Sequence, residues 1–284
     1  MIRNSGGFAF SCMLALALSA AVAHAGAAKS GITIETVQVT GEREELRKAI
    51  VTFVANVTRR DGENVGRWRY SICPSVSGVT PEQGEFIRSR LLEVARSVGA
   101  PANTKKNCGP NLLIVLTEQP AQLWEQWRKS QPKMFFVESQ EAIRRALETP
   151  RPVSAWQNAI VVNGDGRAPT STNQYRLVDS RIHASVSEDI TSVIVMVDTS
   201  ATGKATFGQL ADYLAVVSLA RIDLDADFAD AGSILRVFAK DAEGAPARLT
   251  NWDHAFLKAL YLPDKPLLQP RTDIELTMRE ELAP

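Results

Sequence analysis

Hydrophobic residues recur with helical spacing in several segments of the chain. The clearest helix opens at Thr80-Pro81-Glu82-Gln83, which offers a threonine N-cap, a proline at the first helical position and a glutamine that completes a capping box. It is expected to run to about Val98, and Gly99 ends it. The same spacing predicts helices over 42–57, 80–98, 121–147 (two pieces separated by Pro132), 206–222, 250–262 and 273–282.

Other segments have the pattern of strands. Leu112 to Leu116 and Ser192 to Val197 are apolar runs, which predict strands buried on both faces of a sheet. Residues 31–40 alternate and end at Gly41, so a strand is expected there too. Further strands are expected over 159–162, 175–187 and 234–238. Without a regular βαβ alternation or a repeat, the fold class is predicted as α+β: a single compact domain in which a mixed sheet packs against several amphipathic helices.

The segment 206–222 is the most apolar of the predicted helices. It is expected to be buried against the strand 192–197, with Asp212 and Arg221 at its remaining polar edge. Its start, Thr206 with Gln209, repeats the capping box, as does Thr250 with Asp253 at a later helix. These polar residues therefore have a structural role before any catalytic one is considered.

The first 25 residues have the pattern of a secretory signal peptide. Arg3 supplies the positive start, Phe8 to Val22 is apolar, and Ala23-His24-Ala25 offers small residues for cleavage after Ala25. The expected domains are thus a signal peptide, 1–25, and one α+β domain, 26–284, of 259 residues (284 − 25). No later run approaches the ~18 apolar residues of a membrane-spanning helix. A periplasmic or secreted protein that is not integral to the membrane is therefore expected.

Charge argues against nucleic acid as a partner. The chain has 32 basic and 32 acidic residues, and the signal peptide removes only Arg3, which leaves a net charge of about −1. No positive surplus is available to neutralise phosphates. The basic residues of 59–69 lie among acidic ones and are interpreted as a solvated face.

Two cysteines remain after the signal peptide, which takes Cys12 with it. In an oxidising compartment, Cys73 and Cys108 are most simply one disulfide, which stabilises the fold by roughly 3–4 kcal/mol on the chain-entropy model. The alternative is a nucleophilic cysteine with a histidine base, and it would leave the other thiol unpaired.

Three aspartates, Asp223, Asp225 and Asp227, have the 1-3-5 spacing of a calcium loop. Phe228 stands where an EF-hand needs glycine, and Ile234 where it needs a bidentate glutamate. The sequence therefore excludes an EF-hand but leaves two readings open. One is a weak cation site at these aspartates, and the other is a solvated acidic loop.

No catalytic constellation is complete in the sequence. His183 and His254 are expected on outward faces, no G-x-S-x-G elbow occurs, and the Gly203-Lys204 loop lacks the other residues of a phosphate-binding loop. We therefore expect no catalytic residue, no metal and no cofactor. A triad whose members meet only in space stays open as the alternative.

Several motifs occur in an order that suggests a family. They are Val37-Gln38-Val39-Thr40-Gly41, Cys73-Pro74-Ser75-Val76-Ser77-Gly78, Cys108-Gly109-Pro110-Asn111 and the segment Leu249 to Tyr261, LTNWDHAFLKALY. With these motifs the chain resembles a family of uncharacterised secreted bacterial proteins. The resemblance implies export and a shared fold, and it implies no activity.

A more distant resemblance is to zinc-peptidase-like folds, in which a buried strand precedes a helix with H-E-x-x-H. Gln209 and Tyr213 stand at the positions of the two histidine ligands, and Leu210 stands at the position of the glutamate base. This resemblance therefore implies a peptidase scaffold without its zinc site.

The function expected from the sequence is a non-catalytic, exported protein that binds an unknown envelope protein or a small ligand. The alternative is a hydrolase on a metallopeptidase-like scaffold, and a purely structural role in the envelope is the third possibility.

Overall fold

The computed structural model describes residues 34–58, 65–105, 107–131, 143–144, 147–148, 151–163, 179–180, 183–184, 186–203, 205–229, 231–239, 242–262 and 270–283. The chain divides into two units, Met1–Thr40 and Gly41–Pro284. Of the first unit only residues 34–40 are described, and they are helical. The predicted signal peptide and its cleavage site lie outside the described residues.

A five-stranded sheet is the centre of the second unit. Its central strand is β7 (Val186–Asp198), which pairs with β4 (Val153–Asn163) in antiparallel fashion. β7 also pairs in parallel with β3 (Leu112–Thr117) and with the short β1 (Arg67–Trp68), and β2 (Pro74–Ser77) pairs in parallel with β3. The sheet is therefore mixed, as expected. A separate hairpin contains β5 (Asp179–Ser180) and β6 (His183–Ala184).

Side chains that alternate along β3 and β7 divide the interior into two layers. Ile114 and Val195 face the main core, whereas Ile194 and Met196 face a smaller cluster around Trp124. Both runs are buried on both faces, as their continuous apolar sequence predicts.

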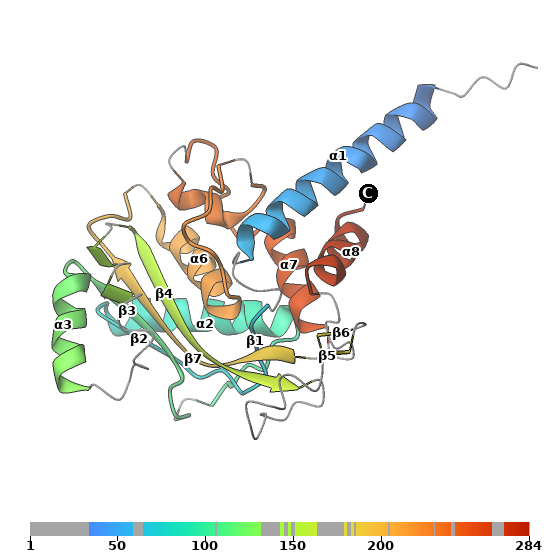
Figure 1. The fold of residues 1–284 in the computed structure, drawn as a ribbon. Coiled ribbons are helices and arrows are strands. Elements are labelled where there is room, and N and C mark those ends of the chain that lie inside the picture. Colours follow the sequence, from blue (N-terminus) through green and yellow to red (C-terminus); the bar gives the residue numbers. More distant parts are fainter. Residues whose placement is uncertain are drawn as a thin grey trace, which may run out of the picture. The chain divides into compact units, whose positions relative to one another are not determined.

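Helices cover both faces of the sheet (Figure 1). On the main-core side lie α2 (Pro81–Ser97) and α6 (Phe207–Leu219), together with α7 (Asn251–Tyr261) and α8 (Pro270–Leu282). On the other side lies α3 (Pro120–Ser130). The mixed sheet and its helical layers confirm the predicted α+β class.

Local capping chemistry sets where three of these helices begin. The hydroxyl groups of Thr80, Thr206 and Thr250 each accept a hydrogen bond from the backbone N–H three residues later. The side chain of that later residue accepts in turn from the backbone N–H of the threonine. All three predicted capping boxes are therefore confirmed, and each is worth about 1 kcal/mol.

Two predicted strands are wrong. Residues 34–40 belong to helix α1 (Ile34–Val57), which continues without a break through Gly41. Extending a helix adds one hydrogen bond per residue, whereas a strand needs a partner for its backbone. Residues 234–238 form the 3-10 helix η2 (Ile234–Phe238). The strand was predicted there because a short apolar run does not distinguish a strand from a helical segment.

The disulfide between Cys73 and Cys108 is present, with 6.0 Å between the two Cα atoms. It joins the residue before β2 to the segment that enters β3. The backbone N–H of Cys73 also donates to Oδ1 of Asn111, at 2.7 Å. The amino ends of β2 and β3 are therefore held together covalently as well as through the sheet.

None of the helices in the described ranges has the length and apolar content that crossing a membrane requires.

Candidate functional site

The strands β3 and β7 end side by side, but the chain leaves them toward opposite faces of the sheet. After Thr117 it enters α3, and after Asp198 it enters α6 on the other face (Figure 1). In open sheets, ligands bind outside the carboxyl ends of two neighbouring strands at such a switch point. We therefore take residues 117–118 and 198–200, called here the carboxyl edge, as the candidate functional site.

Hydrogen bonds fix the backbone of the carboxyl edge. The N–H of Thr199 donates to the carbonyl oxygen of Thr117 at 3.0 Å, which continues the ladder between β3 and β7. Oδ1 of Asp198 accepts from both the N–H and the hydroxyl of Ser200, at 3.0 and 2.5 Å. Asp198 is half-buried, while Thr199 and Ser200 are exposed. A preformed edge therefore presents a carboxylate and hydroxyl groups to solvent.

The turn after β2 packs closely against the same end of β3. Gly78 has φ +84°, and a Cβ at this position would lie 1.9 Å from the carbonyl oxygen of Leu116. Only glycine tolerates both the left-handed conformation and this approach. The turn leads directly to Thr80, so α2 and α6 both begin beside the carboxyl ends of parallel strands.

One arginine lies next to the carboxyl edge. Arg151 lies two residues before β4, and the intervening Pro152 accepts a hydrogen bond at its carbonyl oxygen from the N–H of Asp198 at 2.9 Å. The guanidinium of Arg151 forms an ion pair with Asp225 at 2.8 Å, and its side chain is 20% exposed. This carboxylate offsets the positive charge of Arg151.

The three aspartates of the possible cation site have separate local contacts. Oδ1 of Asp223 accepts from the N–H of Asp225 at 3.1 Å, and Oδ1 of Asp227 accepts from the N–H of Ala229 at 2.9 Å. Within the described ranges, no three His, Cys, Asp or Glu side chains are grouped so that they could hold a metal ion. The cation site therefore stays a sequence prediction, and it would require these carboxylates to rearrange.

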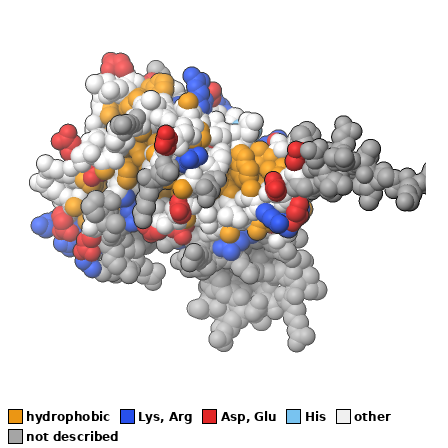
Figure 2. Space-filling model, turned by 90° about the horizontal axis from the view of Figure 1, so that it is seen from above, with side chains coloured by type: hydrophobic (Ala, Val, Ile, Leu, Met, Phe, Trp, Pro, Cys, Tyr) orange, Lys and Arg blue, Asp and Glu red, His pale blue; other side chains and the backbone are white. Residues whose placement is uncertain are grey.

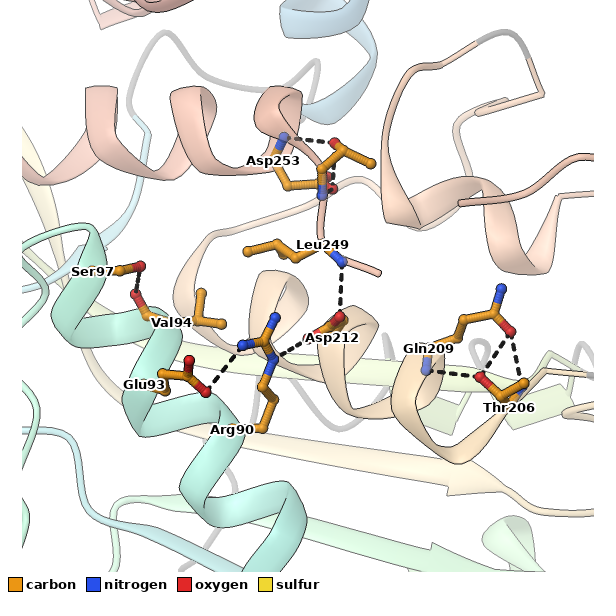
Figure 3. Close-up of polar contacts among 10 residues, drawn as sticks. Arg90, Glu93, Val94, Ser97, Thr206, Gln209, Asp212, Leu249 and Asp253 are labelled. Carbon is orange, nitrogen blue, oxygen red and sulfur yellow. Dashed lines mark hydrogen bonds and ion pairs between the residues drawn. The ribbon is translucent and has the colours of Figure 1, made fainter. Parts of the chain in front are cut away.

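The residues at the zinc-peptidase positions are engaged in packing. Gln209 completes the cap of α6 (Figure 3). Its Nε2 also donates to the carbonyl oxygen of Pro246 at 2.8 Å. Leu210 and Tyr213 are buried, and the ring of Tyr213 packs edge-on against Phe238 with 4.8 Å between centroids. Burial raises the pKa of the Tyr213 hydroxyl well above its ordinary value, so it stays protonated.

Asp212 corrects an expectation from the sequence, because it lies in the interior instead of at a polar edge. It is 2% exposed, and its Oδ1 pairs with Nε of Arg90 from α2 at 2.5 Å (Figure 3). Its Oδ2 accepts from the N–H of Leu249 at 2.7 Å. Asp212 therefore connects α6 to α2 and to the segment that precedes α7. Arg221, the other residue expected at that edge, is half-buried and pairs with Glu188.

Asp253 is a second buried carboxylate with a structural role. It caps α7 through the N–H and hydroxyl of Thr250, and it also accepts from the hydroxyl of Ser233 and the N–H of Ile234. Burial raises the pKa of Asp253, whereas these donors oppose that shift. The carboxylate fixes the start of η2 against the start of α7.

Neither Cys73 nor Cys108 has a free thiol that could act as a nucleophile, because the two cysteines are bonded to each other. His254 is half-buried in the first turn of α7, and the side chain of His183 lies outside the described residues. The hydrogen bonds among the described side chains do not join a histidine to a hydroxyl.

Comparison of the chain with family models, curated proteins and solved structures finds no match.

The carboxyl edge is not apparent from the sequence, although a signal for it is present. Each of the two apolar runs ends in a polar residue, Thr117 and Asp198 respectively. Two such runs, when they are parallel neighbours, place those residues together. The pairing of the strands was not available from the sequence.

Proposed function

We propose that this chain is an exported, non-catalytic protein that binds a partner protein or small ligand of the cell envelope at its carboxyl edge. The observation that carries the proposal is the divergence of α3 and α6 from the adjacent ends of β3 and β7. The disulfide between Cys73 and Cys108 supports an oxidising compartment. The sequence of residues 1–25 supports export.

The role of the polar side chains on α6 and α7 favours binding over catalysis. Gln209, Asp212 and Asp253 all stabilise helix starts or helix contacts, so they are not free to act on a substrate. The surface also favours a partner without a strong charge of one sign. In the view of Figure 2, described Lys and Arg side chains are interspersed with Asp and Glu.

The proposal is tested by placing a large side chain at the carboxyl edge. Thr199→Arg alters an exposed residue whose backbone, and not its side chain, makes the local contacts. The matched control is Ser71→Arg, an exposed residue that precedes β2 and therefore lies toward the opposite end of the parallel strands. Pull-down from an envelope extract, followed by mass spectrometry, should recover a specific partner or ligand with the wild type and the control only.

Equal capture by both variants would place binding elsewhere and overturn the proposal. Hydrolysis of a peptide or ester library that disappears in Thr199→Arg would replace it with the hydrolase alternative. N-terminal sequencing of the envelope protein checks export independently, with Gly26 as the expected first residue.

A further inference from the structure

The guanidinium group of Arg151 has one hydrogen-bonding edge that is only half occupied. Its Nη2 forms the ion pair with Oδ1 of Asp225, at 2.8 Å. Its Nε is shielded from solvent and has no hydrogen-bond partner among the described residues. In a guanidinium group, Nε–H and one N–H of Nη2 point in the same direction, so together they match the two oxygens of one carboxylate. A buried donor without an acceptor costs free energy, and this edge therefore favours a group that satisfies both donors.

Asp225 is a partner that another carboxylate can replace. Its side chain is 76% exposed, and it lies in the loop between α6 and η2. The N–H of Asp225 donates to Oδ1 of Asp223 at 3.1 Å, so the local fold of this loop does not depend on the ion pair. Exposed ion pairs contribute little to stability. The position of Asp225 shows which chemical group Arg151 accepts, and its exposure shows that the group can be exchanged.

Arg151 lies at the border of the carboxyl edge. The carbonyl oxygen of Pro152, the next residue, accepts from the N–H of Asp198, which places Arg151 beside the end of β7. Arg151 also lies close to α6: burial raises the pKa of the Tyr213 hydroxyl, and the charge of Arg151 opposes that shift. The guanidinium is therefore available next to the switch point, where ligands bind in open sheets.

We infer that Arg151 binds a carboxylate group of the ligand, and that Asp225 occupies this place until the ligand replaces it. The inference rests on the proposed function, because it names the chemistry of the ligand that binds at the carboxyl edge. A carboxylate fits better than a phosphate group, since one carboxylate replaces another without adding charge. A phosphate dianion would add a negative charge near an edge that already carries Asp198 and Glu118.

Nitrogen–proton correlation NMR of the mature protein, with its disulfide intact, tests the inference with acetate as the probe. Acetate should shift the Nε–H signal of Arg151 until the shift saturates, and Arg151→Lys identifies that signal by its loss. Asp225→Asn should strengthen acetate binding by about two- to fivefold, because a competing carboxylate is removed. Inorganic phosphate should bind more weakly than acetate at the same ionic strength. A shift that does not saturate, or that sodium chloride reproduces, would overturn the inference.

The two partners of the ion pair separate binding from a structural role. In capture from the envelope extract, Arg151→Gln should reduce recovery by about tenfold or more, whereas Asp225→Asn should increase it. If the pair only stabilised the fold, the two substitutions would change recovery in the same direction, and that result would contradict the inference. Glu125→Gln is the matched control, since Glu125 forms an exposed pair with Arg128 on α3, and it should leave acetate binding and recovery unchanged.

Further arms distinguish the source of the carboxylate. Tighter binding of N-acetyl-dialanine than of acetate, lost in its amide, indicates the carboxyl terminus of a partner protein, and equal binding of the two acids indicates a small ligand. The inference and the proposed function fail differently. If Thr199→Arg abolishes capture but acetate does not bind, only the inference is overturned. If acetate binds Arg151 but Thr199→Arg captures as the wild type does, only the proposed function is overturned.

Discussion

Helices α6 and α3 pack on opposite faces of the same two strands, yet they are buried to different extents. Ten consecutive residues of α6, Leu210 to Leu219, are buried, including Asp212 and Ser218. In α3 only Trp124 is buried. Their sequences differ accordingly: α6 is apolar nearly all round, whereas α3 carries charged and polar residues on most of its surface.

The difference shows what each helix does for the fold. α6 is enclosed by the sheet, α2, η2 and α7, so its packing is shared among many elements. α3 rests with one side on Ile194 and Met196 as a satellite cluster. A helix enclosed in this way unfolds with the domain, while a helix that lies on one face can open locally. Four substitutions test this comparison.

Leu214→Ala should have the largest effect. Leu214 is fully buried near the centre of α6, and the loss of its side chain should reduce the free energy of unfolding by about 2–5 kcal/mol through lost burial and a residual cavity. Chemical denaturation measures the change. Leu276→Ala, at an exposed leucine of α8, is the control and should cost less than about 0.5 kcal/mol.

Trp124→Ala should cost less, about 1–3 kcal/mol, although a larger side chain is removed. The reason is that α3 can undock while the main core stays intact. Hydrogen exchange should show rapid exchange in α3 and unchanged protection in α6. Equal loss of protection in both helices would mean that the two layers unfold as one unit.

Asp212→Asn should cost about 1–2 kcal/mol. The amide oxygen can still accept from Leu249, but the charge that pairs with Arg90 is lost. Arg90 also pairs with Glu93, whose side chain is 62% exposed. Glu93→Gln is therefore the matched control, and thermal unfolding should show little change because that pair is solvated. An equal shift of the unfolding temperature in both variants would show that the buried pair of Asp212 with Arg90 stabilises the fold no more than the solvated pair with Glu93.

Thr206→Ala should have the smallest effect, about 1 kcal/mol, since it removes one cap at the start of α6. Thr206→Ser keeps a hydroxyl and should restore most of the loss in the same denaturation experiment. Failure of serine to restore stability would show that the threonine methyl group, and not the cap, matters here.

The sequence by itself determined the elements whose cause is local. The threonine caps of α2, α6 and α7 need only residues three positions apart, and β3 and the carboxyl-terminal half of β7 need only continuous apolar runs. The burial of α6 also follows from its composition. These features depend on contacts within a few residues, so pattern and propensity are sufficient to predict them.

Only the tertiary structure decided which distant residues meet. Arg90 and Asp212 are 122 positions apart, and no local pattern distinguishes this buried pair from a solvated one. The same holds for η2, whose start depends on Asp253 of α7, and for the carboxyl edge, which depends on the pairing of β3 with β7. The physical reason is that strand order and helix placement arise from long-range packing, and one sequence pattern is compatible with several such arrangements.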